Sequence, residues 1–254
     1  MLYGMYLSTA GMKAQEYRNS VIANNLANSQ TTAFKRDIAL LEPRANASVE
    51  DPQMFGYNMP VLSDLSGGVT WGPTYTDLSQ GSLRQTNNQT DVALSGRGFF
   101  VLQGKGNTPL LTRDGSFLVR ADGTLVTAGD GTPVLGANRK PVHVNPRIPI
   151  EIAQNGQIMQ DNKTVGKLAL DTVKSPWDLK QLGQNQFTVV RPNAIEPAPA
   201  ETQVRQGFLE NSSVDPTVEM VNMITAQRIF SANAKMVTYQ GQMLQELDTV
   251  GMVL

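Results

Sequence analysis

Apolar side chains recur at three- and four-residue steps along the C-terminal part of the chain. From Pro216 to Leu254 the sequence has no further proline, and its only glycines are Gly241 and Gly251. One apolar row holds Met220, Met223, Phe230, Ala234, Val237 and Leu244, and an adjacent row holds Ala226, Ile229, Met236, Met243, Leu247 and Val250. Two rows form a face too wide for one partner. The pattern predicts a long terminal helix that packs against several neighbours.

A second proline-free stretch, Leu2 to Leu26, carries another wide apolar stripe and predicts a helix at the start of the chain. The stretch from Pro43 to Pro73 has no clear period and is rich in turn-forming residues. It also contains large apolar residues, among them Met54, Phe55 and Trp71. Two alternatives stay open for it, a disordered linker and an extended segment that packs against something.

Between Thr76 and Glu210, short β-type runs alternate with turn signals. The dipeptides Asp114-Gly115, Asp122-Gly123 and Asn155-Gly156 predict hairpin turns, because these residues tolerate the positive φ of tight turns. Gly96-Arg97-Gly98 precedes β-forming residues, which favours a tight turn into a strand over a phosphate-binding loop.

The two ends must meet in space to bury their apolar stripes. We therefore predict an α+β fold in which the terminal helices pack as a coiled-coil-like unit, with a mainly antiparallel β domain inserted between them. The expected ranges are 1–33 with 212–254 for a discontinuous helical domain, 34–75 for an extended connection and 76–211 for a β-rich outer domain.

Composition excludes several classes of function. The 254 residues carry 21 Lys and Arg against 22 Asp and Glu, so no basic face for nucleic acid is expected. We expect no membrane insertion, because long apolar runs are missing, and no cleaved signal peptide, because the N-terminus lacks a basic leader. With no cysteine and a single histidine, His143, we expect no metal site, no cofactor and no nucleophile–histidine pair.

Two alternatives from other classes remain. Asp114 and Asp122 are candidates for the acid and base of a cell-wall glycosidase, although aspartate is common at turns. The other alternative is a soluble β-rich binding module that dimerises through a coiled coil.

Polar residues beside the two apolar faces are the remaining candidates. Asn24, Asn25 and Asn28 crowd around Leu26, although asparagine is a mediocre helix former. Asn28 fits a helix cap, whereas Asn24 or Asn25 fits a residue that fixes the register of packed helices. The pair Gln227-Arg228 is either a solvated flank or a pairing group between helices.

Several stretches, in order along the chain, resemble motifs of the bacterial flagellar rod and hook protein family. Val21–Asn28 with Phe34-Lys35-Arg36 is similar to the N-terminal signature. The β-domain motif is matched by Asp91–Leu94, Gly96–Phe100, Thr112–Phe117 and Asp122–Val126, and the C-terminal motif by Gly207–Ser212 and Met223 to Leu244. Ala33 stands where members usually have glycine.

The resemblance implies a non-enzymatic structural subunit of the flagellar basal-body rod, which spans the periplasm. It implies export through the flagellar type III apparatus without signal cleavage, and assembly with other rod and hook-family subunits into a homo- and hetero-oligomeric helical array. The size of the chain and the lack of a very large outer insertion argue against the hook protein. The lack of a polar insertion after the first helix favours the proximal rod type, with the distal rod type as the alternative. The expected assembly contacts are Asn24, Asn25, Leu26, Asn28, Phe34, Met223, Ile224, Gln227, Arg228, Phe230, Met243 and Leu244.

Overall fold

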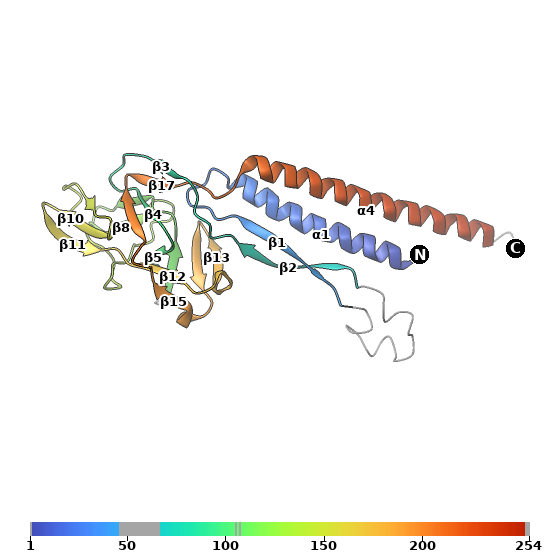
Figure 1. The fold of residues 1–254 in the computed structure, drawn as a ribbon, viewed down its shortest axis with the longest axis horizontal. Helices are drawn as coiled ribbons and strands as arrows, with labels where there is room; N and C mark the ends of the chain where they lie inside the picture. The colour runs from blue at the N-terminus through green and yellow to red at the C-terminus, as the bar shows by residue number, and fades with distance from the viewer. Residues whose placement is uncertain (1, 46–66, 105, 107, 252–254) are drawn as a thin grey trace. The chain divides into compact units, whose positions relative to one another are not determined.

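The computed structural model describes residues 2–45, 67–104, 106 and 108–251. Within them two long helices combine with many short, mostly antiparallel strands, so the α+β class is confirmed (Figure 1). The chain divides into two compact units. The helical unit consists of the described parts of Met1–Ala27, Asp37–Tyr75 and Asp215–Leu254, and the β-rich unit consists of the described parts of Asn28–Arg36 and Thr76–Val214.

Both predicted terminal helices are present in the helical unit. They are α1 (Leu2–Ala27) and α4 (Pro216–Gly251), which lie side by side (Figure 1). A cap fixes the start of α4, because the Asp215 carboxylate accepts hydrogen bonds from the N–H groups of Thr217 at 2.8 Å and Val218 at 3.3 Å. Pro216 occupies the first helical position, where the missing N–H costs nothing.

A two-stranded sheet of β1 (Asp37–Pro43) and β2 (Val69–Thr76) packs against α1. The rings of Tyr17 and Trp71 lie 6.2 Å apart between centroids. The described ends of the stretch from Pro43 to Pro73 therefore form ordered strand structure next to the helix. The remaining apolar residues named for that stretch, Met54 and Phe55, lie outside the described residues.

The β-rich unit is centred on a six-stranded antiparallel sheet. Its strand order is β13-β14-β6-β5-β12-β15. The strands are β5 (Phe99–Gln103), β6 (Pro109–Thr112), β12 (Leu170–Val173), β13 (Leu179–Gly183), β14 (Gln186–Val189) and β15 (Ile195–Pro197). Short 3₁₀ helices, η2 (Pro176–Asp178) and η3 (Pro192–Ala194), connect its outer strands.

Smaller sheets complete the unit. They are β3 (Leu83–Gln85) with β17 (Phe208–Glu210), β4 (Val92–Ser95) with β16 (Gln203–Gln206), β7 (Phe117–Val119) with β8 (Leu125–Thr127), and β10 (Gln157–Gln160) between β9 (Glu151–Ile152) and β11 (Lys163–Lys167). Each pair is antiparallel.

Alternation along β5 builds the core on both faces of the large sheet. Phe100 and Leu102 point into one buried cluster, and Phe99 and Val101 point into a second. Edge-to-face aromatic contacts fix both clusters, with ring centroids 5.1 Å apart for Phe100 and Phe117. The dense apolar run after Gly98 is therefore a central strand buried on both sides.

Two of the three predicted hairpin turns are confirmed. Asp122-Gly123 joins the paired strands β7 and β8, and Asn155-Gly156 joins β9 and β10. The prediction for Asp114-Gly115 is wrong, because β6 and β7 do not pair with each other. Gly115 instead allows a close backbone approach, since a Cβ atom there would lie 1.6 Å from the carbonyl oxygen of Val92.

Residues 28–36 follow α1 in the chain but fold into the β-rich unit. The Ala33 N–H donates to the Glu210 carbonyl at 2.8 Å, and the Ser213 N–H donates to the Phe34 carbonyl at 3.0 Å. The turn before Phe34 places Ala33 at a φ of 56° with its side chain fully buried. This left-handed conformation strains any residue with a Cβ atom, which explains why glycine suits this position.

Replacing Ala33 with glycine should raise the free energy of unfolding of the β-rich unit. Relief of the left-handed conformation is worth about 1 to 2 kcal/mol, and loss of one buried methyl group offsets about 0.8 kcal/mol. Denaturant unfolding of the purified chain measures the difference. Ala93→Gly is the matched control, because Ala93 is equally buried in β4 without a positive φ and should only lose stability. A destabilised Ala33→Gly variant would contradict the strain.

Candidate functional site

One face of α4 packs against α1. A row at alternating four- and three-residue steps is buried or half-buried, and it consists of Glu219, Met223, Ala226, Phe230, Asn233, Val237, Gln240 and Leu244. Asn233 and Gln240 of this row lie against Gly11 and Gly4 of α1. We call these eight residues the inner row. It combines members of both apolar rows seen in the sequence, because the helices meet along the boundary between them.

A second row on α4 is exposed. It consists of Val218, Val221, Ile229, Met236, Tyr239, Met243 and Leu247, whose exposed fractions range from 39% to 60%. These residues also follow three- and four-residue steps or multiples of them, so they share one face of the helix. We call them the outer stripe. The stripe is interrupted between Val221 and Ile229, where Thr225 is exposed. An apolar stripe on an exposed helix face is typical of a protein-protein contact surface.

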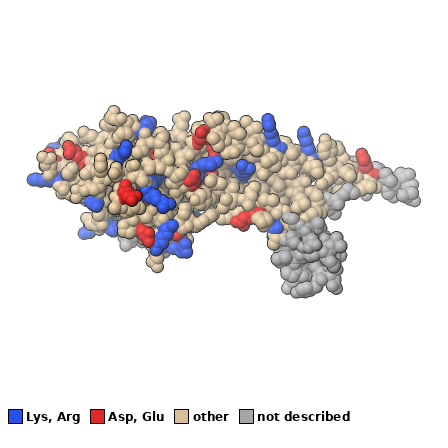
Figure 2. Space-filling model, viewed as in Figure 1, with Lys and Arg blue, Asp and Glu red and all other residues tan. Residues whose placement is uncertain are grey.

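The inner row contains one charged residue, Glu219, and the outer stripe contains none. Lys and Arg side chains are scattered over the face shown in Figure 2 and form no continuous basic patch there. Neither α1 nor α4, as described, contains a segment apolar enough to span a membrane.

The candidate residues at the end of α1 occupy different environments. Asn24 is exposed, and Leu26 and Asn28 are half-buried. Asn25 is buried, and its amide donates to the Asp37 carbonyl at 2.7 Å and accepts from the Asp37 N–H at 3.0 Å. Asn25 therefore fixes the first residue of β1 to α1. The Asn28 carbonyl accepts a hydrogen bond from the Thr31 N–H at 3.1 Å in the turn that follows.

Phe34 is buried in the β-rich unit, and seven of the candidates belong to α4. Among those candidates, the structure brings Met223, Phe230 and Leu244 together in the inner row. A larger group is exposed, and it consists of Ile224, Gln227, Arg228 and Met243. The twelve predicted contacts thus separate into residues that pack within the chain and residues that are open to a neighbour.

A buried ion cluster in the β-rich unit was missed by the sequence analysis. The Lys35 ammonium lies 2.5 Å from Oε1 of Glu210 and donates to the Ser79 carbonyl at 2.6 Å. Nη1 of Arg113 lies 3.3 Å from the second oxygen of Glu210. Lys35 and Glu210 are each only 1% exposed. No signal in the sequence links these residues, because 175 positions separate the carboxylate from the ammonium.

Burial dominates the electrostatics of this cluster. Removal from water lowers the pKa of Lys35 below its ordinary value, although the Glu210 carboxylate counteracts the effect. Burial likewise lowers the pKa of Arg113, again against the attraction of Glu210. One carboxylate therefore compensates two buried cations, and the Gly81 N–H also donates to Oε1 of Glu210 at 2.9 Å.

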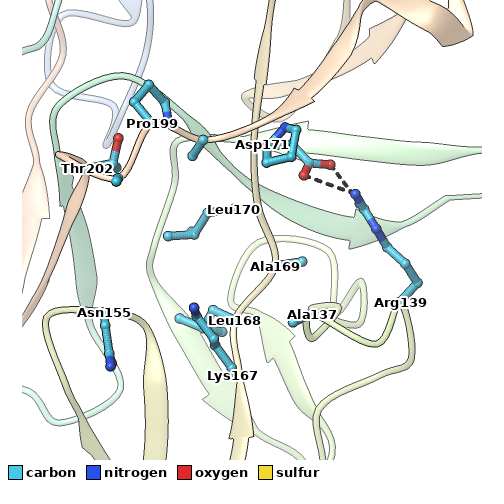
Figure 3. Close-up of a pocket in the computed structure, with 13 residues that line it drawn as sticks. Ala137, Arg139, Asn155, Lys167, Leu168, Ala169, Leu170, Asp171, Pro199 and Thr202 are labelled. Atoms are coloured by element: carbon cyan, nitrogen blue, oxygen red, sulfur yellow. Dashed lines mark hydrogen bonds and ion pairs between the residues drawn. The ribbon is translucent and has the colours of Figure 1, made fainter.

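The β-rich unit also contains a hollow of about 480 Å³ (Figure 3). Leu168, Leu170 and Pro199 are among its lining residues. Its single lining carboxylate, Asp171, is held by the Arg139 guanidinium at 2.7 and 3.0 Å. This bidentate pair engages the one lining carboxylate, and Lys167 is the other ionisable lining residue besides Arg139.

The turn carboxylates also have structural roles. The Asp114 carboxylate accepts hydrogen bonds from the Ser116 N–H and hydroxyl, and burial raises the pKa of Asp114. The Asp122 carboxylate accepts from the Thr124 N–H at 2.9 Å, which lowers its pKa. His143 lies 3.2 Å from the Thr124 hydroxyl on an exposed edge. The residues that the structure describes contain no cluster of acidic or histidine side chains able to hold a metal ion.

Two family models match the chain. One, described as "Flagellar basal body rod FlgEFG protein C-terminal", matches residues 205–250, which include most of α4. The other, described as "Flagellar hook protein FlgE/F/G D1 domain", matches residues 93–161 in the β-rich unit.

Similar proteins extend this likeness over nearly the full length. The flagellar basal-body rod protein FlgG of Buchnera aphidicola subsp. Schizaphis graminum is 33% identical over 263 residues, covering 98% of this chain and 99% of the relative. FlgG of Borreliella burgdorferi is 30% identical and covers 96% of the chain and 97% of the relative. The basal-body rod protein FlgF of Caulobacter vibrioides is 30% identical over 85% of the chain and 84% of the relative.

The ion cluster predicts an ordered series of stabilities. Glu210→Gln should lower the free energy of unfolding of the β-rich unit by about 3 to 5 kcal/mol, because it leaves two buried cations without their counter-charge. Lys35→Met should cost less, because Arg113 and Glu210 then remain as a neutral pair. Denaturant unfolding followed by circular dichroism measures both changes.

Lys174→Met serves as the control for this series. Lys174 forms an exposed ion pair with Glu196 at 3.2 Å, and its loss should cost no more than about 1 kcal/mol. If Glu210→Gln behaved like this control, the cluster would not be essential to the fold.

Proposed function

The chain belongs to the family of bacterial flagellar basal-body rod proteins, and from this premise we propose that it polymerises through the outer stripe of α4. Proteins of this family are structural and not enzymes, so the chain is a structural component of the basal body that serves motility. The glycosidase reading is therefore wrong. The family assembles as an axial structure, and the proposal concerns the surface that this chain uses.

The exposure of the outer stripe carries the proposal. Met236, Tyr239 and Met243 each expose half or more of their surface to solvent in the single chain. Side chains of this kind gain about 25 cal/mol per Å² when a neighbour covers them. A stripe that runs along a helix also suits a head-to-tail array, in which each subunit presents one surface and receives another.

The inner row has a different role in this proposal. We propose that α1 and α4 form a coiled-coil-like pair within each subunit, through Met223, Phe230 and Leu244 among others. The exposed residues Ile224 and Met243 then belong to the surface between subunits. Gln227 and Arg228 are exposed on the same helix, and we propose that they pair with polar groups of a neighbour.

The position in the rod is the finer question. The proximal type, favoured from the sequence, has less support than the distal type. The FlgG relatives match 96% or more of the chain in the two cases given above, whereas the FlgF relative matches 85%. We therefore propose the FlgG, or distal, type. Its partners would be further copies of itself and other axial subunits in a helical array.

We further propose that the chain reaches the rod through the flagellar type III export apparatus without cleavage. The absence of cysteine supports this route, since a thiol is a liability for a chain that leaves the reducing cytoplasm. The small net charge of −1 neither supports nor opposes this export route.

Met236→Asp should block assembly without unfolding the chain. The new carboxylate would be solvated in the single chain but buried without a partner in the array, which costs several kcal/mol. Each 1.4 kcal/mol lowers incorporation about tenfold. The amount of subunit in isolated basal bodies and swimming in soft agar measure the effect, and circular dichroism confirms the fold.

Gln242→Asp is the control for this change. Gln242 is exposed on α4 beside Met243 in the sequence but outside the outer stripe, so the same charge should be tolerated there. Phe230→Asp should differ from both, because it introduces a charge into the inner row and should loosen α1 from α4. Normal incorporation of Met236→Asp would remove the outer stripe as the assembly surface.

A further inference from the structure

Two glycines of α1 leave room for amide side chains of α4. A Cβ atom at Gly4 would lie 2.5 Å from Nε2 of Gln240, and one at Gly11 would lie 2.8 Å from Nδ2 of Asn233. Both distances are shorter than a van der Waals contact. Each amide therefore occupies the space that an α1 side chain would otherwise fill.

The two contacts define one antiparallel alignment. Seven residues forward from Gly4 to Gly11 on α1 correspond to seven residues back from Gln240 to Asn233 on α4. Three-residue steps within this alignment place Leu7 opposite Val237 and Ala14 opposite Phe230. Of these four layers, three set a small residue of α1 against a larger residue of α4.

A shift by one heptad keeps one glycine opposite an amide, Gly4 with Asn233 or Gly11 with Gln240, but disturbs the packing of other layers. A seven-residue shift of α4 in one direction places Leu7 opposite Phe230, which crowds that layer. The same shift places Gly11 opposite Ala226, which leaves a void in the next layer. The other direction sets the side chain of Arg18 against Asn233, where Gly11 had left space. The apolar positions alone do not distinguish these alignments, because they repeat with the same period.

The amides themselves are costly at these positions. Oε1 of Gln240 is buried and makes no hydrogen bond within the described residues. A buried polar atom without a partner lowers stability, whereas polar residues between packed helices are a known means of fixing register. An apolar side chain of similar size would fill the same space without this cost.

We propose that Gly4 with Gln240 and Gly11 with Asn233 are register-setting pairs, which specify the alignment of α1 and α4 and exclude the alignments shifted by one heptad. The inference concerns packing within one chain and does not depend on where the subunit lies in the rod. The alignment matters for any contact that uses both helices, because a shifted α4 would displace its outer stripe along α1.

Disulfide crosslinking of the purified full-length chain tests the alignment, since the natural sequence contains no cysteine. The aligned pair is Leu7→Cys with Val237→Cys. The two shifted alignments are reported by Leu7→Cys with Leu244→Cys and by Ala14→Cys with Met223→Cys. The rate of intramolecular disulfide formation, followed by non-reducing gel electrophoresis, should be at least about tenfold higher for the aligned pair.

The register-setting pairs are then removed in the same cysteine backgrounds. Gly4→Leu with Gly11→Leu should lower the ratio of aligned to shifted crosslinking at least about tenfold, equal to about 1.4 kcal/mol of register preference. Gly241→Leu is the matched control on α4, because a Cβ atom there meets nothing within 4 Å, and it should leave the ratio unchanged.

A size-exchange variant separates loss of register from loss of packing. Gly11→Leu combined with Asn233→Gly should restore the aligned preference that Gly11→Leu alone reduces, because the larger side chain then comes from α1. The proposal is overturned if the aligned pair crosslinks no faster than the shifted pairs, if the glycine replacements leave the ratio unchanged, or if size exchange fails to restore it. None of these outcomes bears on assembly through the outer stripe.

Discussion

The β-rich unit contains a single carboxylate buried between two cations. Glu210 compensates Lys35 and Arg113, which come from the segment after α1 and from the end of β6. Desolvation makes such a cluster expensive to form, and it is stable only when every member is paired. Through Lys35, the cluster joins residues 28–36 to the rest of the β-rich unit. A chain segment near the N-terminus and one near position 210 complete the same folded body.

Local signals predicted much of the fold. The start of α4 at Pro216 and the hairpin at Asp122-Gly123 need only neighbouring residues, so a single sequence contains the necessary information. The pairing of Lys35 with Glu210 is invisible at that level, because it joins distant positions and each residue alone resembles a solvated charge. The turn at Gly115 was assigned to the wrong role for a related reason. Glycine is required there because the backbone of Val92 lies close by, and the Asp-Gly dipeptide itself does not reveal this contact.

The candidate surface was predictable only in part. Periodicity identified two apolar rows on α4, but which side of α4 packs against α1 depends on Gly4 and Gly11. Glycine has no side chain and does not contribute to an apolar pattern. The positions on α1 that leave room for Gln240 and Asn233 could therefore not be predicted from that pattern. Gly241 had no explanation from the sequence, and nothing in the described structure requires glycine there. Met223 and Phe230 were predicted as assembly contacts and are half-buried in the inner row, whereas Ile224 and Met243, predicted for the same role, are exposed.

The hydrogen bonds around Phe34 have a mechanical consequence. The chain passes between the two units four times, after Ala27, Arg36, Tyr75 and Val214. The segments that follow α1 and precede α4 are hydrogen-bonded to each other in the β-rich unit, from Ala33 to Glu210 and from Ser213 to Phe34. Separating these two segments under tension would require both hydrogen bonds to break, so the segments that lead to the two terminal helices stay together as long as this part of the β-rich unit is folded.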